Sequence, residues 1–138
     1  MGRVEGITLV LNRDGDIRTV ESVAAEAGRG LEGDYHSNLT LIAAEALEGL
    51  REDTGIELSG RDTRRNVLTS GIDLNALVGE RFKVGDVECV GVELCEPCTT
   101  LEGATRPGVI KAYVHRAGLN ADILTDGEIA VGDAVERM

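Results

Sequence analysis

The sequence predicts a mainly β fold with a few helices, an α+β domain built around a barrel of strands. The chain has 138 residues with one Phe, two Tyr and no Trp, so small aliphatic side chains must fill the core. Its 18 glycines indicate many turns, which favours a β-rich domain over a helical bundle. Segments 79–88 and 127–136 each carry Val-Gly-Asp between short apolar runs, and they predict two equivalent barrel corners.

The N-terminal half alternates predicted strands and turns. Asp14-Gly15 between apolar runs is typical of a hairpin. The residues Ala43, Ala46, Leu47 and Leu50 recur at helical spacing, and Gly55 is the predicted end of that helix. The predicted elements are strands at 3–11, 17–20 and 39–42, a hairpin turn at 12–15, a glycine-punctuated loop at 27–34 and a helix at 43–52.

The C-terminal half contains further short strands and the cysteines. Strands are predicted at 66–68 and 121–124, a single turn at 72–78, and a strand or helix at 109–114. A regular strand from Val87 puts Cys89 and Cys95 on one face. Pro97 cannot donate a ladder hydrogen bond, so this strand should end before it. The absence of a linker predicts a single domain over residues 1–138.

The charge of the chain limits its partners and its location. The net charge is −11, which repels phosphate backbones and anionic membranes, so neither nucleic acid nor membrane is an expected partner. Neither a membrane span nor a signal peptide is apparent, which predicts a soluble, cytoplasmic protein. An acidic protein poor in lysine and aromatics also suits a cytoplasm rich in salt, where counterions screen the repulsion.

The motif Cys95-Glu96-Pro97-Cys98 leaves three interpretations open. A redox pair needs a helix at the motif, and only a short polar stretch follows. Structural zinc needs about four ligands, and the remaining soft donors are scattered. A single reactive thiol at Cys98 fits, because Thr99 and Arg106 are available to stabilise an anion. The alternative for Cys98 is a buried, inert cysteine.

Other candidate residues also have two interpretations each. His36 follows the glycine loop and lies either in a pocket or on an exposed loop. Arg65 and its neighbours form either an anion contact or a solvated basic face. Cys89 is expected to fill the core.

In order along the chain, these motifs resemble the MOSC domain, named for the C-terminal part of molybdenum-cofactor sulfurases. The resemblance runs from about residue 3 to the C-terminus. One departure is Tyr35, which stands where many relatives have Arg. The matching motifs are Gly30-Leu-Glu-Gly-Asp34 with His36, Leu39-Thr-Leu-Ile42 with Glu45, Arg65-Asn66-Val67, Gly71-Ile-Asp-Leu74, residues 77–86, Cys95-Glu-Pro-Cys98, Arg106-Pro-Gly108 and residues 126–133.

The resemblance implies a mixed closed β-barrel of the MOSC or pyruvate-kinase-barrel-like type. It also implies that Cys98 carries sulfur as a persulfide or ligates molybdenum, both of which suit a soft thiolate. Cys95 is then an accessory thiol. The residues expected to bind the molybdenum-pterin cofactor are Asp34, His36, Arg65, Asn66, Thr99 and Arg106.

Three functions follow from this resemblance. The first is a sulfur carrier that receives sulfur from a separate cysteine desulfurase and has a molybdoenzyme as the alternative partner. The second is a cofactor-dependent reductase component for N-hydroxylated substrates, working with an electron-donating partner. The third is a non-catalytic module that binds cofactor or anion. Pyridoxal phosphate is not expected, because the two lysines, Lys83 and Lys111, lie in no recognisable Schiff-base setting. The sequence leaves open the oligomeric state and whether the chain is an enzyme.

Overall fold

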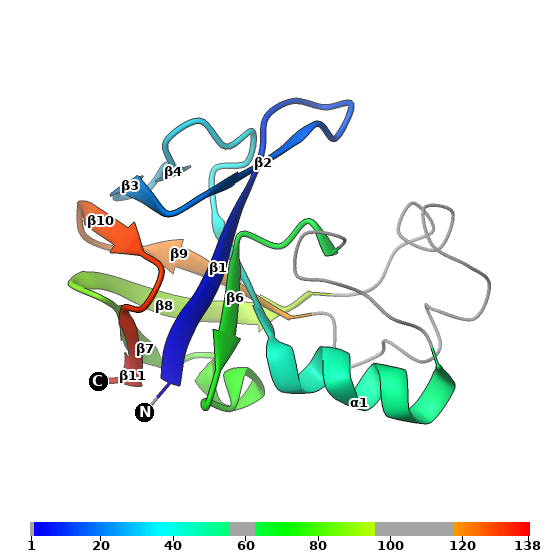
Figure 1. Ribbon diagram of the computed structural model, residues 1–138. Helices are drawn as coiled ribbons and strands as arrows, with labels where there is room; N and C mark the ends of the chain where they lie inside the picture. Colours follow the sequence, from blue (N-terminus) through cyan, green and yellow to red (C-terminus); the bar gives the residue numbers. More distant parts are fainter. Residues whose placement is uncertain (1, 56–62, 96–117) are drawn as a thin grey trace.

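Figure 1 shows the computed structural model, which describes residues 2–55, 63–95 and 118–138. Strands dominate this part of the chain, and none of its helices is long and apolar enough to cross a membrane. The elements are β1 (Gly2–Val10), β2 (Ile17–Val20), β3 (Ser22–Glu26), β4 (Gly30–Leu31), β5 (Leu39–Ala43), α1 (Ala44–Thr54), β6 (Val67–Ser70), the 3-10 helix η1 (Leu74–Leu77), β7 (Arg81–Val84), β8 (Val87–Leu94), β9 (Leu119–Ile123), β10 (Gly127–Ala130) and β11 (Ala134–Arg137).

The larger sheet closes into a mixed barrel, as the sequence predicts. Its strand order is β11-β7-β8-β9-β5-β6-β1-β2, and an additional pairing of β11 with β1 closes the ring. The pair β5–β6 is parallel, and its neighbours β5–β9 and β1–β6 are antiparallel. Closure leaves β2 as an antiparallel extension of β1, formed by the hairpin that Asp14-Gly15 predicts.

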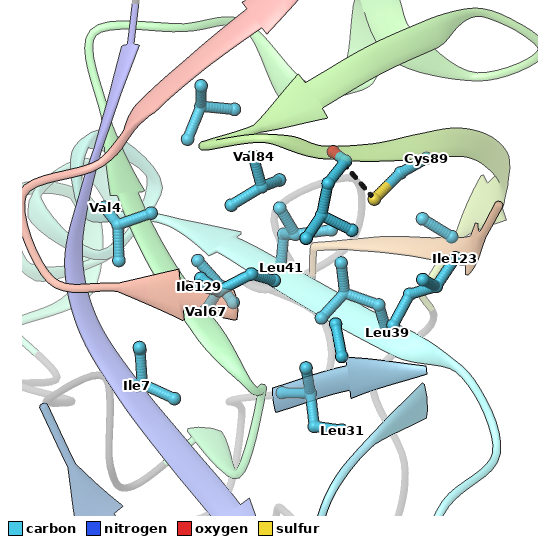
Figure 2. Packing of buried hydrophobic residues seen from close by; sticks show 14 of the residues in the cluster. Val4, Ile7, Leu31, Leu39, Leu41, Val67, Val84, Cys89, Ile123 and Ile129 are labelled. Carbon is cyan, nitrogen blue, oxygen red and sulfur yellow. Dashed lines mark hydrogen bonds between the residues drawn. The ribbon is translucent and has the colours of Figure 1, made fainter. Parts of the chain in front are cut away.

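A smaller sheet of β10, β3 and β4 adds side chains to the barrel interior. Val23, Ala25, Leu31 and Ile129 from these strands belong to the same buried cluster as the barrel residues. Figure 2 shows Leu31 and Ile129 within that cluster. Aliphatic residues fill most of it, as the composition requires, and Phe82 is fully buried.

The two Val-Gly-Asp turns are not equivalent, contrary to the sequence-based expectation. The turn at Gly85 joins β7 and β8, which pair with each other as a hairpin. The turn at Gly132 joins β10 and β11, which belong to different sheets. The two turns meet, because the Gly85 N–H donates to the Ala134 carbonyl over 2.8 Å. A β-carbon on Gly85 would lie 2.5 Å from Oδ2 of Asp133.

Helix α1 covers part of the outer wall of the barrel. It packs against β5 and β6 and buries Leu47 and Leu50, as its helical spacing predicts. Ile42 of β5 is also fully buried. The helix ends at Gly55, whose left-handed φ of 75° lets its N–H donate to the Arg51 carbonyl over 2.7 Å.

Candidate functional site

Strand β8 contains a bulge close to its end. Gly91 pairs with Ala121 of β9, and Glu93 pairs with Asn120, so Val92 has no partner of its own across the pair. An inserted residue of this kind shifts the alternation of side chains along a strand by one position. The faces expected for a regular strand are therefore wrong beyond Gly91.

The bulge separates the two described cysteines. Cys89 is fully buried in the core, but Leu94, rather than Cys95, packs against that core at the end of β8. Cys95 is half-buried, and its N–H donates to the carbonyl of Gly118 over 2.8 Å.

Burial raises the pKa of the Cys89 thiol from 9.0 to about 12. A thiol with this pKa stays protonated at neutral pH, and the thiolate is the nucleophilic form. Cys89 is therefore core filler, as the sequence predicts, and it is not a reactive thiol.

A pocket of about 470 Å³ lies at the start of α1. It is lined by Ala43, Glu45 and Ala46, by residues 71–75 and by Gly118, whose carbonyl holds Cys95. The Glu45 carboxylate accepts a hydrogen bond from the Gly71 N–H over 2.7 Å and ties α1 to the end of β6. The pocket and Cys95 are thus neighbours on the outside of the barrel.

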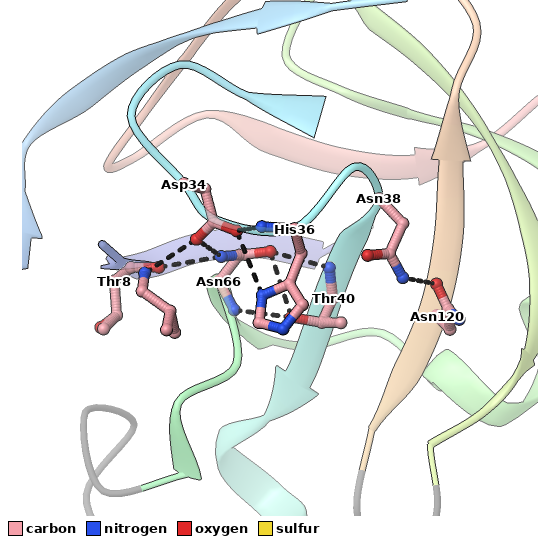
Figure 3. A network of polar contacts seen from close by, with 8 residues as sticks. Thr8, Asp34, His36, Asn38, Thr40, Asn66 and Asn120 are labelled. Atoms are coloured by element: carbon pink, nitrogen blue, oxygen red, sulfur yellow. Dashed lines mark hydrogen bonds and ion pairs between the residues drawn. The ribbon is translucent and has the colours of Figure 1, made fainter. Parts of the chain in front are cut away.

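Asp34 is buried in a polar network shown in Figure 3. Its Oδ2 accepts hydrogen bonds from the Val10 N–H and from the Asn66 side-chain amide, both over 2.8 Å. Its Oδ1 accepts from the His36 N–H over 2.9 Å. Three N–H donors surround the carboxylate, so it joins the loop after β4 to β1 and to the start of β6.

Asn66 uses its whole side-chain amide within the protein. Its Nδ2 donates to the Thr8 carbonyl over 3.1 Å as well as to Asp34. Its Oδ1 accepts from the backbone N–H of Thr40 over 3.1 Å and from the Thr40 hydroxyl over 3.2 Å. The Thr40 hydroxyl in turn accepts from the Asn66 N–H over 2.9 Å. Asn66 therefore joins β1, β5 and β6 and keeps little capacity for a ligand.

His36 lies at the exposed edge of this network. Its side chain is 52% exposed, and Nδ1 lies 3.4 Å from Oδ1 of Asp34. The ring of Tyr35 stands edge-on to the imidazole, with ring centroids 5.3 Å apart. The arrangement orients the imidazole and leaves Nε2 without a partner among the described residues.

Arg65 directly precedes Asn66 and follows a residue with a strained backbone. Arg64 has a left-handed φ of 58°, which is costly for a residue with a β-carbon. The Arg65 N–H donates to the buried Thr63 hydroxyl over 3.2 Å. The turn brings the half-buried Arg65 next to Asn66.

Asn38 and Asn120 form a second polar pair that the sequence does not reveal. The Asn38 side-chain amide donates to Oδ1 of Asn120, across 82 positions of the chain. Both side chains are partly buried. In the strand register Asn120 faces Thr40 of β5 on one side and Glu93 of β8 on the other. Strand pairing alone brings these residues together, so no local sequence signal identifies them.

Four of the predicted binding residues gather on one side of the barrel: Asp34, His36, Arg65 and Asn66. Their contact with a cofactor stays a prediction. The other predicted site residues, Cys98, Thr99 and Arg106, lie outside the described ranges, as do residues 109–114. Within those ranges, no three His, Cys, Asp or Glu side chains gather as a metal site.

Solved structures share this fold at low sequence identity. The YuaD protein from Bacillus subtilis superposes with a TM-score of 0.84 at 16% identity, covering 99% of this chain and 96% of that one. YiiM from Geobacillus stearothermophilus gives 0.78 at 15% identity, covering 100% of this chain and 75% of that one. YiiM from Escherichia coli gives 0.75 at 14% identity, covering 99% and 69%.

The sequence itself was compared with curated proteins and with family models. No curated protein matches it. The family model described as the MOSC domain matches residues 28–136, which include Asp34, Asn66, Cys95 and both Val-Gly-Asp turns. The chain belongs to the MOSC domain family.

Proposed function

We propose that this protein carries sulfur for the molybdenum-pterin cofactor, with Cys98 as the carrier thiol. The family match supports a function related to this cofactor. The observation that carries the proposal is the position of Cys95, half-buried beside the pocket at the start of α1. Cys98 follows only three residues later in the sequence.

The transfer step needs a single thiolate on this chain. The Cys98 thiolate attacks the outer sulfur of a persulfide on a cysteine desulfurase. A new S–S bond forms on Cys98, the S–S bond of the donor breaks, and the donor cysteine leaves as a thiolate. The transferred sulfur keeps its proton, and no external oxidant or reductant is consumed.

The polar groups on the side of the barrel that carries the Asp34 network fit a large, anionic heterocycle. The half-buried Arg65 offers a guanidinium for a phosphate, and Arg106 is a second candidate for this contact. The partly buried amides of Asn38 and Asn120 offer donors and acceptors for a ring. When bound, the cofactor supplies a molybdenum centre that accepts the transferred sulfur.

Asp34 and Asn66 act as positioning residues in this proposal. Asn66 is saturated by contacts within the protein, and Asp34 is buried among three N–H donors. They hold the loop carrying His36 against β1 and β6. His36 is the member of this network whose side chain is exposed to a ligand.

Cysteine variants test the proposal. Cys98→Ser should abolish sulfur delivery from a cysteine desulfurase to the cofactor. Cys95→Ser is the matched control, and it should retain delivery because Cys95 is an accessory thiol. A Cys98→Ser protein that binds cofactor and delivers sulfur at the parent rate would rule the proposal out.

A further inference from the structure

Two pairs of polar side chains lie beside each other on this side of the barrel. The hydrogen-bonding groups of one pair are fully satisfied within the protein, and those of the other pair are satisfied only in part by the described residues. The Asn66 amide and the Thr40 hydroxyl are engaged with each other and with their neighbours. Asn38 and Asn120 make one side-chain contact between them. Of these two pairs, the second is therefore the one that can offer amide groups to a ligand.

Among the residues that the structure describes, the contact between Asn38 and Asn120 leaves half of each amide available. Asn38 donates through Nδ2, so its Oδ1 keeps its acceptor capacity. Asn120 accepts through Oδ1, so its Nδ2 keeps its two donors. Figure 3 shows this pair joining the residue before β5 to the start of β9, beside the Asp34 network. Partly buried amide groups without partners are costly, unless a ligand or water pairs with them.

Glu93 adds a carboxylate to this pair. The bulge at Val92 sets Glu93 directly across from Asn120, and paired residues in neighbouring strands project from the same face of a sheet. Glu93 is exposed, and its carboxylate has no hydrogen bond or ion pair among the described residues. Without the bulge, Val92 would take the place of Glu93.

We infer that Glu93, Asn120 and Asn38 form a recognition edge for a 2-amino-4-oxopyrimidine ring, the ring shared by pterins and guanine. One edge of this ring presents an amino group and a ring N–H beside a carbonyl. A carboxylate accepts from both N–H groups, as from the fork of an arginine, and an amide NH₂ donates to the carbonyl. Glu93 supplies the carboxylate and Asn120 the amide, and Asn38 holds Asn120 in place.

This inference deepens the proposed function and rests on it, because a pterin is the heterocycle of the proposed cofactor. It assigns recognition of the ring to residues outside the cysteine motif itself, although Glu93 precedes Cys95 by only two residues. Glu93 also makes the edge selective, since a carboxylate pairs with the amino group of the ring and repels a carbonyl in its place.

Binding of small heterocycles to the intact chain tests the inference. The probes are pterin, lumazine, in which a carbonyl replaces the amino group, and guanosine, with titration followed by fluorescence or calorimetry. Pterin should bind the parent protein more tightly than lumazine. Glu93→Gln and Asn120→Asp should each weaken pterin binding about tenfold or more.

The variants are chosen to preserve the fold. Asn120→Asp keeps the oxygen that accepts from Asn38 and replaces the donating NH₂ by an oxygen. Glu93→Gln changes an exposed side chain. Asp122→Asn is the matched control, because it removes one exposed carboxylate two residues along β9 and should leave binding unchanged. Unfolding curves that match the parent exclude loss of fold as the cause.

A parallel measurement separates the inference from the proposed function. The molybdenum and pterin content of the parent protein is measured after production in cells that make the cofactor. If the parent carries cofactor but pterin binding is equal in all variants, the recognition edge is wrong and the function stands. If pterin or guanosine binds through Glu93 and Asn120 but cofactor never does, the edge stands and the function is wrong. Tighter binding of guanosine assigns the edge to a guanine nucleotide, and binding of neither ring overturns the inference.

Discussion

The Asp34 carboxylate accepts a hydrogen bond from the Asn66 side-chain amide over 2.8 Å, and this contact ties the loop after β4 to the barrel. The other neighbours of this carboxylate are also N–H donors, from Val10 and His36. An amide at position 34 would turn an NH₂ group toward at least one of them. Asp34→Asn should therefore lower the free energy of unfolding by about 1–3 kcal/mol, measured by urea denaturation.

Asp126→Asn is the control for this substitution. Asp126 is exposed, and its Oδ1 accepts one hydrogen bond, from the Ala27 N–H over 2.8 Å. An exposed amide can rotate to keep that bond with its oxygen, so the loss should be smaller. Equal losses in the free energy of unfolding at both positions would contradict the claim that burial makes the Asp34 hydrogen bonds more important.

Thr40 and Asn66 should be energetically coupled. The Thr40 hydroxyl donates to Oδ1 of Asn66, and either substitution removes this bond. The bond from the backbone N–H of Asn66 to the hydroxyl is lost only in Thr40→Val. In a double-mutant cycle of Thr40→Val and Asn66→Ala, the coupling free energy should be about 0.5–3 kcal/mol. A cycle of Thr19→Val with Asn66→Ala serves as the control, since Thr19 is exposed on β2, and additive losses for both cycles would refute the network.

The buried Cys89 predicts a loss of stability in alkali. Its folded pKa of about 12 lies above the ordinary value of 9.0, so the folded state holds the proton more tightly than the unfolded state. Its contribution to stability is complete below pH 9 and falls as the pH rises from 9 toward about 12. Cys89→Ala should lessen the decline of the urea midpoint over this range, relative to the parent. An identical decline would show that other groups account for it.

Two glycines with similar backbone angles should differ in their tolerance of alanine. Gly85 and Gly79 both have left-handed φ values, 61° and 76°. A β-carbon on Gly85 would approach Asp133, whereas one on Gly79 would meet nothing within 4 Å. Both substitutions carry the left-handed cost of about 1–2 kcal/mol, and Gly85→Ala should destabilise the protein more. Thermal unfolding that ranks them in the reverse order would contradict the close contact of the two turns.

The acidity of the chain predicts stabilisation by salt. With a net charge of −11, counterions should reduce repulsion within the folded state. The melting temperature should rise from low to molar concentrations of potassium chloride. A curve without such a gain would remove adaptation to a salt-rich cytoplasm as an explanation for the composition.

The sequence predicts those secondary-structure elements that are determined by residues close together in the chain. Asp14-Gly15 gives the β1–β2 hairpin, and the spacing of Leu47 and Leu50 with Gly55 gives α1 and its end. Closure of a barrel is also confirmed, but β4 lies within the segment predicted as a loop, and the sequence analysis assigns no strand to the residues of β3. Both strands are short. β3 pairs with β10 from the far end of the chain, so its cause is not local, and the two-residue β4 pairs with β3.

The candidate site is less visible in the sequence for the same reason. Asp34 and Asn66 are identified by motif, although their hydrogen bonds show that they position other groups. Asn38, Asn120 and Glu93 are brought together by the pairing of β5, β9 and β8. The bulge at Val92 changes the face on which Glu93 lies, and one inserted residue leaves no pattern in a strand that reads as regular.

The central claim is that Cys98 carries sulfur, and the mass of the intact protein tests it most directly. After incubation with a cysteine desulfurase and cysteine, the parent chain should gain the mass of about one sulfur atom. Peptide mapping should place the gain on Cys98, a thiol reductant should remove it, and Cys95→Ser should still show it. No gain in the parent, or a gain that persists in Cys98→Ser, would contradict the account.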